Sequence, residues 1–361
     1  MDCNTVRVFS SDGGGIRGLI PIEVLNRISN QLKMPSNEFW KIADVFCGTS
    51  VGGIIMLALA IGKGVEDIKP LFSEKGKKMF TVRSIAEVAF GSCTTTTENN
   101  RENTLEKIVE IINNDPFYDP HCPWYTDAPG DSNYGVNVLH KTLVEIFGDM
   151  TMQDVKTNVL IPAYEEDTET FRLFSNVNNS AFIGQNEKIV NVAMATSAAP
   201  IYFPSVQFND HTYIDGGIFQ NNPSELGLSL AQSLKKGSNR FCVLSLGTGI
   251  GKMGFDQGAA IMAKRGSAYH DTNSSITKLV KLADEAMTGG QESVHQNLQY
   301  RASNTLENLY YYRFQPKLDP NQNTDLDNAD PEFLQYMLDI ANQYYNDDIA
   351  NITTFLEHLT A

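Results

Sequence analysis

The amino-acid sequence predicts an α/β protein whose central, mostly parallel β-sheet carries helices on both faces. Near the N-terminus, a short apolar strand over residues 6–11 leads through glycines into an amphipathic helix over 19–32, and the same order recurs over 44–61. Further short apolar strands are expected at 158–164, 171–175, 211–214, 241–246 and 309–314. Helical segments fill most of the gaps between them, which is typical of a sheet covered on both sides.

Length and composition indicate a folded protein. The chain has 361 residues, of which 42% are hydrophobic and 20% are charged, which is ordinary for a folded, soluble protein. Because no repeat and no clear linker divides the chain, we expect a single domain over residues 1–361. The longest apolar run, residues 54–61, is far shorter than the roughly 20 residues that cross a bilayer, and is expected to be a buried helix.

Two regions depart from the alternation of strands and helices. Residues 91–135 are polar and rich in Thr, Asn, Asp and Pro, with one helical piece near 105–112. This insertion is interpreted either as a solvated surface loop or as a lid over the site. The C-terminal part, about 274–361, is expected to be a helical extension, with a long amphipathic helix over 274–302 and one or two further helices over 331–359.

Charge and cysteine content exclude several classes of function. A formal charge of −15 argues against a nucleic-acid partner and against adsorption to an anionic membrane through a broad basic face. The five cysteines are scattered and show no C-x-x-C spacing, so neither a disulfide framework nor a structural zinc site is indicated, and no cofactor is expected. The N-terminus lacks the pattern of a secretory signal, which predicts a cytoplasmic protein.

The spacing Gly-x-Ser-x-Gly occurs in Gly48-Thr-Ser-Val-Gly52. A strand is expected to end just before this turn and a helix to begin just after it, which is the arrangement that exposes a nucleophilic serine at the positive end of a helix. Ser50 is therefore the candidate nucleophile. The alternative is that Ser50 only caps the helix.

A second glycine turn, Asp12-Gly-Gly-Gly-Ile-Arg-Gly18, follows the first strand. It matches Gly-x-Gly-x-x-Gly at Gly13, Gly15 and Gly18, so a dinucleotide-binding oxidoreductase is one alternative. However, Asp12 would repel a pyrophosphate at this position. Three consecutive glycines also leave their backbone N–H groups free to point at one spot, which near a serine nucleophile makes an oxyanion hole.

The proton acceptor for the serine is not an obvious histidine. His295 and His358 fall within expected amphipathic helices, and His270 is the best of a poor set. A sharper candidate is Asp215, which ends a short apolar strand and precedes two glycines, where ligands bind in open α/β folds. An ordinary turn aspartate is the alternative.

Taken together, these stretches make the sequence resemble the patatin-like phospholipase family. The resemblance depends on four segments in the family's order and a fifth that supports them, which are residues 12–18, 48–52, 197–204, 215–223 and 245–249. Residues 312–315 resemble a strand of the family in the C-terminal part. The resemblance implies a patatin-like three-layer sandwich with its catalytic core at about residues 6–250.

The resemblance also implies roles for particular residues. The catalytic groups would be a Ser-Asp dyad, with Ser50 as the nucleophile and Asp215 as its partner, in place of a triad. Arg17 would help to hold a headgroup phosphate, or would brace the loop through an ion pair. The oxyanion hole would be formed by backbone amides of Gly13, Gly14, Gly15 and Ile16.

The expected function is that of a lipid acyl hydrolase of phospholipase A type, which cleaves fatty-acyl esters of glycerophospholipids and associates transiently with membranes. Relatives of similar length include cyclic-nucleotide-activated antiphage effectors and phospholipases injected into host cells, so an activating ligand or protein is a further hypothesis. The competing hypotheses are the dinucleotide-binding oxidoreductase and a catalytically inactive lipid-binding module. The oligomeric state does not follow from the sequence.

Overall fold

The computed structural model describes residues 5–72, 76, 136–200, 203, 205–235, 237–238, 240–251, 275–304, 308–324 and 326–361. The predicted polar insertion at 91–135, with its helical piece, lies outside these ranges, as does His270. The proposed division of residues 1–361 into core, insertion and extension of one domain therefore stays a prediction.

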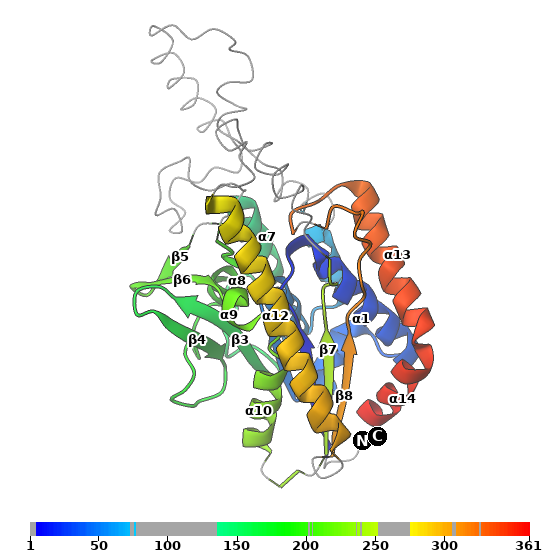
Figure 1. Cartoon of the computed structure of the whole chain (residues 1–361). Coiled ribbons are helices and arrows are strands. Elements are labelled where there is room, and N and C mark those ends of the chain that lie inside the picture. The colour runs from blue at the N-terminus through cyan, green and yellow to red at the C-terminus, as the bar shows by residue number, and fades with distance from the viewer. Residues whose placement is uncertain are drawn as a thin grey trace, which may run out of the picture.

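Eight strands of the described residues form one sheet in the order β5-β6-β3-β2-β1-β7-β8, with β4 paired to β3 (Figure 1). Their bounds are β1 Thr5–Ser11, β2 Val45–Gly48, β3 Asn158–Glu165, β4 Thr170–Ser175, β5 Val206–Phe208, β6 His211–Asp215, β7 Arg240–Leu246 and β8 Leu309–Phe314. The strands β3, β2, β1, β7 and β8 run parallel. At one edge, β4, β5 and β6 add antiparallel pairs. The predicted α/β sheet is confirmed, and its antiparallel edge, with β5, is an addition that the sequence did not indicate.

Helices cover both faces of this sheet, as expected. The larger core includes α1 (Leu19–Leu32), α2 (Val51–Ala60), α7 (Val136–Phe147), α8 (Ile189–Ser197), α13 (Pro331–Asp347) and α14 (Ile349–Thr360). The smaller core includes α10 (Ser224–Leu234) and α12 (Ser275–Ser303), with α12 on the near side in Figure 1. The short helices are α3 (Val65–Ile68) and α9 (Gly217–Gln220), and 3₁₀ turns lie at 15–18, 36–41 and 69–72. The predicted helical C-terminal extension is thus present as α12, α13 and α14.

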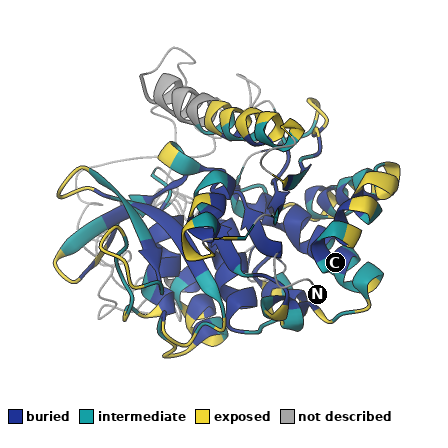
Figure 2. Ribbon diagram, turned by 90° about the horizontal axis from the view of Figure 1, so that it is seen from below, coloured by how far each residue is buried: buried dark blue, intermediate teal, exposed yellow. Residues whose placement is uncertain are grey.

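The strands separate two apolar cores because side chains alternate between the faces of a strand. In β1, Val6 and Val8 belong to the smaller core, whereas Phe9 belongs to the larger one. Val45 and Phe46 divide in the same way in β2. The result is a three-layer sandwich, and Figure 2 shows its buried interior around the sheet, with exposed positions on the outer sides of the helices.

The central helix α2 is apolar throughout, and every residue from Val51 to Ala60 is buried. Such a helix has no polar face to turn towards water, so it packs between the sheet and the neighbouring helices instead of on the surface. The sequence-based expectation of a buried helix is confirmed. Among the described residues, no helix has both the length and the apolarity needed to cross a membrane.

The topology brings together the three turns that follow β1, β2 and β6, at the carboxyl-terminal ends of the parallel strands. The parallel strands β1 and β2 both end there, at Ser11 and Gly48, which pair with each other. Beyond that point β3 continues, and β6 runs back along it in the opposite direction until Asp215 lies opposite Ala163. Asp215, the last residue of β6, therefore lies near the ends of β1 and β2, where the two glycine turns begin.

Candidate active site

The turn after β2 holds Ser50 in a strained conformation. Its backbone has φ 54° and ψ −129°, which few non-glycine residues adopt. A Cβ on Gly52 would collide with the main-chain oxygen of Ser11, so glycine allows this turn to pass close to the end of β1. The Ser50 N–H donates to Thr196 Oγ1 at 3.0 Å, whereas its side chain makes no cap hydrogen bond to α2. The turn therefore directs the hydroxyl away from a capping role.

The Asp215 carboxyl lies close enough to the Ser50 side chain for the Ser50 hydroxyl to lower the pKa of that carboxyl. Asp215 is 4% exposed, and its Oδ1 accepts the Gly217 N–H at 2.7 Å. Burial raises the pKa of the Asp215 carboxyl to about 7, although the hydrogen bonds from Ser50 and Gly217 each lower it. Near neutral pH this carboxyl group can both accept and return a proton.

The candidate histidines that the structure describes have partners elsewhere. His295 Nδ1 lies 3.1 Å from Tyr311 Oη, and His358 Nδ1 lies 2.7 Å from Arg240 Nη2. His295 thus joins α12 to β8, and His358 joins α14 to β7. Neither contact includes Ser50. Neither histidine is therefore placed to take the Ser50 proton, whereas the Asp215 carboxyl lies beside Ser50.

The glycine loop after β1 lies against the serine turn. A Cβ on Gly13 would stand 3.1 Å from Ser50 Cβ. Two of the four amides predicted for an oxyanion hole already have acceptors: the Gly13 N–H donates to the Asn221 carbonyl at 3.3 Å, and the Ile16 N–H donates to the Leu326 carbonyl at 2.8 Å. The structure therefore gives these two amides a role in holding the loop.

The other two predicted amides are those of Gly14 and Gly15. Within the part of the chain that the structure describes, neither N–H donates to a main-chain or side-chain acceptor. Gly15 has φ +55°, which a glycine adopts at little cost. Arg17 follows in the same turn and is 9% exposed, so its guanidinium is largely buried beside the loop. Its predicted contact with a headgroup phosphate stays a prediction.

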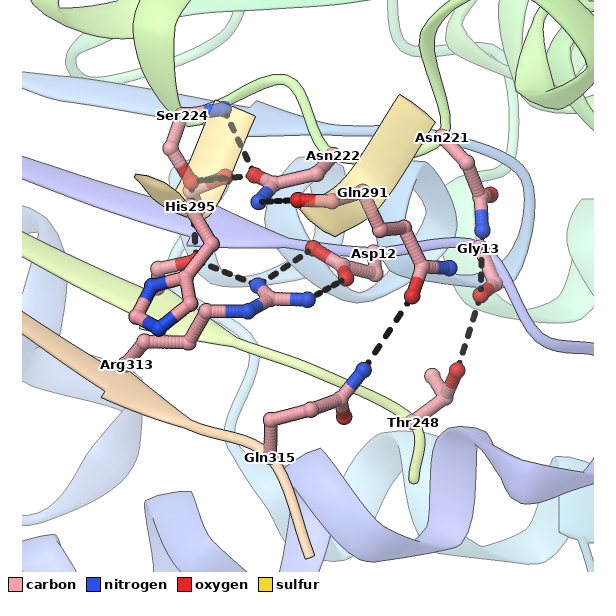
Figure 3. A network of polar contacts seen from close by, with 12 residues as sticks. Asp12, Gly13, Asn221, Asn222, Ser224, Thr248, Gln291, His295, Arg313 and Gln315 are labelled. Atoms are coloured by element: carbon pink, nitrogen blue, oxygen red, sulfur yellow. Dashed lines mark hydrogen bonds and ion pairs between the residues drawn. The ribbon is translucent and has the colours of Figure 1, made fainter. Parts of the chain in front are cut away.

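A buried ion pair fixes the start of the glycine loop. Arg313 Nη2 and Nη1 lie 2.6 Å and 3.3 Å from the two carboxylate oxygens of Asp12, and Nη1 also donates to Ser245 Oγ at 2.7 Å (Figure 3). The side chains of Asp12 and Arg313 are 0% and 4% exposed. Burial raises the pKa of Asp12, and Arg313 opposes that effect. The pair ties the end of β1 to β8, on the far side of β7.

Sequence reasoning missed this role of Arg313. The strand over 309–314 was recognised, and Asp12 was considered only as an obstacle to a pyrophosphate. A signal was nevertheless present, because a charged residue within an apolar strand needs a partner of opposite charge when it is buried. Asp12 directly follows the first strand and Arg313 lies near the end of the strand over 309–314. The two could therefore have been proposed as an ion pair.

Strand–turn–helix geometry of this kind occurs in several hydrolase families, so a comparison with known proteins decides between them. A family model described as a patatin-like phospholipase matches residues 9–227, which is more than half of the chain and includes both glycine turns and Asp215. The chain belongs to the patatin-like phospholipase family. The expected enzyme class, a lipid acyl hydrolase, is thereby confirmed.

Several patatin-like relatives match most of the chain. A cGAMP-activated phospholipase of Pseudomonas aeruginosa is 28% identical over 325 residues, covering 89% of this chain and 81% of the relative. A cGAMP-activated phospholipase of Escherichia coli is 28% identical over 353 residues, covering 93% and 87%. Patatin-like protein 2 of Arabidopsis thaliana is 25% identical over 373 residues, covering 97% and 85%. The similarity therefore extends beyond the core into the C-terminal helices.

Proposed function

We propose that the protein is a phospholipase A that cleaves fatty-acyl esters of glycerophospholipids, with Ser50 as the nucleophile and Asp215 as the general base. The observation that carries this proposal is a buried carboxyl group, Asp215, that lies beside the Ser50 side chain and whose pKa is raised to about 7. An ordinary surface aspartate, with a pKa near 4, would be a weak proton acceptor. Burial makes Asp215 a stronger base.

In the acylation step, Ser50 Oγ attacks the ester carbonyl carbon while its proton passes to Asp215. The negative charge that develops on the carbonyl oxygen is stabilised by backbone amides of the glycine loop, for which Gly14 and Gly15 are the available donors. One such donor is typically worth about 3 kcal/mol in the transition state. The bond to the lysophospholipid oxygen then breaks, and that oxygen takes the proton from Asp215.

In the deacylation step, a water molecule attacks the acyl-enzyme. Asp215 accepts one proton from the water, the bond between the acyl carbon and Ser50 Oγ breaks, and the proton moves on to Ser50. A fatty acid leaves and the enzyme returns to its starting state. The same carboxyl group therefore serves as base and acid in both steps.

Labelling with a fluorophosphonate, together with fatty-acid release from phosphatidylcholine vesicles, tests the proposal. Wild type should be labelled and should release fatty acid, and Ser50→Ala and Asp215→Asn should do neither. Ser175→Ala is a matched control, because Ser175 is also a buried serine but bonds to the Val159 carbonyl on β3. Labelling that survives Ser50→Ala would overturn the assignment, and an unlabelled, folded wild type would favour an inactive lipid-binding module.

The dinucleotide-binding alternative requires the loop at Gly13, Gly15 and Gly18 to receive a pyrophosphate. Asp12 pairs with Arg313 at the start of that loop, and a Cβ on Gly18 would stand within 3 Å of Val51 and Phe72 side chains, so this glycine serves helix packing. These contacts favour the hydrolase. Addition of NADH should leave the melting temperature unchanged, and a clear rise would revive the oxidoreductase.

We further propose that an activating ligand controls the enzyme, as the name cGAMP-activated phospholipase states for two of the relatives. The expected result is faster fatty-acid release from vesicles when cGAMP is added. Lack of stimulation would remove this proposal and leave the hydrolase assignment intact. The proposed location is the cytoplasm, with transient association at the membrane surface, where the substrate lies. If cGAMP stimulates the enzyme, we further propose an effector role in antiphage defence or against a host.

A further inference from the structure

Asn221 holds the glycine loop with two separate groups. Its carbonyl oxygen accepts the Gly13 N–H at 3.3 Å. Its side-chain Nδ2 donates to the Gly13 carbonyl at 3.4 Å (Figure 3). Because a carbonyl oxygen can only accept, the nitrogen of the amide must be the atom that faces Gly13. The orientation of the side chain follows: Nδ2 faces the Gly13 carbonyl, and Oδ1 lies beside the Gly13 Cα, where an added Cβ would stand.

This Oδ1 is buried and accepts no hydrogen bond from the described residues. Asn221 as a whole is 3% exposed. A buried polar atom without a partner typically costs about 1–3 kcal/mol, so its presence in a folded protein asks for an explanation. A role in binding a polar atom during the reaction is one such explanation.

The surroundings of Oδ1 place it beside the proposed catalytic pair. A Cβ on Gly13 would collide with Asn221 Oδ1 and would stand 3.1 Å from Ser50 Cβ. A Cβ on Gly217 would stand 3.0 Å from Asp215 Oδ1 and 3.1 Å from Asn221 Oδ1. The carboxylate oxygen and the amide oxygen therefore flank the same small space beside Gly217, which Met287 Cε borders at 3.4 Å from the same Cβ position.

We propose that Asn221 Oδ1 and the Asp215 carboxylate together hold the water that hydrolyses the acyl-enzyme. The inference rests on the proposed roles of Ser50 and Asp215. A water has two O–H groups: one donates to Asp215, which takes that proton, and the other donates to Asn221 Oδ1. Its lone pair then forms the bond to the acyl carbon, the bond to Ser50 Oγ breaks, and the proton passes from Asp215 to Ser50.

The two steps of the reaction should differ in their need for Asn221. In acylation, the Ser50 hydroxyl is bound covalently to the chain and needs only Asp215 as its acceptor. In deacylation, the water is free to rotate, and a second acceptor fixes the direction of its lone pair. Loss of Oδ1 should therefore slow deacylation far more than acylation.

Asn221→Leu tests this expectation, because leucine has a similar volume and no polar atom. With p-nitrophenyl butyrate, the variant should show a burst of about one equivalent of nitrophenolate followed by turnover slowed on the order of 10- to 100-fold. KM should fall with kcat, so that kcat/KM changes much less than kcat. Mass spectrometry should find the butyryl group on the peptide that contains Ser50.

Thr248→Val is the matched control. Thr248 Oγ1 also donates to the Gly13 carbonyl, at 2.8 Å, so this variant weakens the hold on Gly13 but keeps Asn221 Oδ1. It should show no burst, and any loss of rate should appear in kcat/KM. A burst of equal size in Thr248→Val would show that the position of Gly13 matters and Oδ1 does not.

Asn221→Asp supplies a second variant with a different readout, and it carries the test if Asn221→Leu does not fold. It keeps an oxygen in place but adds a carboxylate close to Asp215, which raises the pKa of that group. The acidic limb of the kcat profile should move to higher pH, with turnover recovered at alkaline pH. Equal loss of acylation and deacylation in Asn221→Leu, or an unshifted profile in Asn221→Asp, would overturn the inference. If the fluorophosphonate did not label the wild type, the proposed function itself would be overturned.

Discussion

Replacement of Asp215 by asparagine should change the pH dependence of stability as well as abolish activity. In the folded protein, burial raises the pKa of Asp215 to about 7, whereas in the unfolded chain the group has its ordinary value of 3.8. The folded state therefore binds a proton more tightly than the unfolded state does. The resulting stabilisation is fully present below the unfolded pKa and is lost as the pH rises through about 7.

The size of the effect follows from the two pKa values. Between them, stability changes by about 1.4 kcal/mol for each pH unit. On going from about pH 8 to about pH 5, wild type should gain roughly 2.5 kcal/mol from this one group. Asp215→Asn lacks the titrating carboxyl and should not gain that amount, while every other titrating group contributes equally to both proteins. Asp215 is 4% exposed, so solvent screening of the effect is small.

Urea denaturation of both proteins at the two pH values measures this difference. The quantity of interest is the gain in unfolding free energy of wild type minus the gain of Asp215→Asn. The pH profile of kcat/KM for wild type gives an independent value for the same group, because the base must be ionised, and activity should fall below about pH 7. Parallel pH dependence of stability in the two proteins would refute the raised pKa, and with it the reason that a carboxylate can serve as the base.

Three further substitutions test the architecture around the dyad. Gly52→Ala places a methyl group against the main chain of Ser11, so we expect a loss of about 1–3 kcal/mol in stability and no fluorophosphonate labelling. Arg313→Gln leaves the Asp12 carboxylate buried without its partner and should cost about 3–5 kcal/mol by urea denaturation, most of which Asp12→Asn in the same chain should restore. Thr196→Val removes the acceptor of the nucleophile's N–H and should lower kcat on the order of 10-fold with little change in KM, since a buried N–H without a partner costs about 1–3 kcal/mol.

Each of these expectations has an outcome that contradicts it. A fully labelled Gly52→Ala protein would mean that β1 can move away from the serine turn. If the double variant were no more stable than Arg313→Gln, the loss would come from packing of the arginine and not from the uncompensated charge on Asp12. A Thr196→Val protein with unchanged kcat would show that the strained turn is held by other contacts.

Several features of the protein could be predicted from short stretches of sequence. The alternation of apolar strands and helices predicted the α/β sheet, and the glycines around Ser50 predicted a turn between a strand and a helix. These predictions succeeded because they depend on local geometry: the periodicity of side chains and the backbone freedom of glycine. Ser50 and Asp215 were singled out as candidates in the same way, from their positions at strand ends, whereas their roles as a dyad were implied by the family resemblance and stay a prediction.

Contacts between distant segments were not predictable from such patterns. The sequence contains both Asp12 and Arg313, but 301 residues separate them, and only the order of β1, β7 and β8 in the sheet brings them together. The Leu326 carbonyl reaches the glycine loop from the C-terminal part of the chain, and it takes up one of the amides expected in the oxyanion hole. No periodicity in the sequence marks either contact.

The sequence by itself therefore determined the elements and the chemical groups at their ends, because both depend on residues close in the chain. The tertiary structure decided which of these groups lie together and how far they are buried. The antiparallel path of β6 brings Asp215 to Ser50, and packing around that carboxyl group removes it from water. Since desolvation is a property of the whole surroundings of a group, the raised pKa on which the proposed role of Asp215 as a base depends arises only when the complete core is assembled.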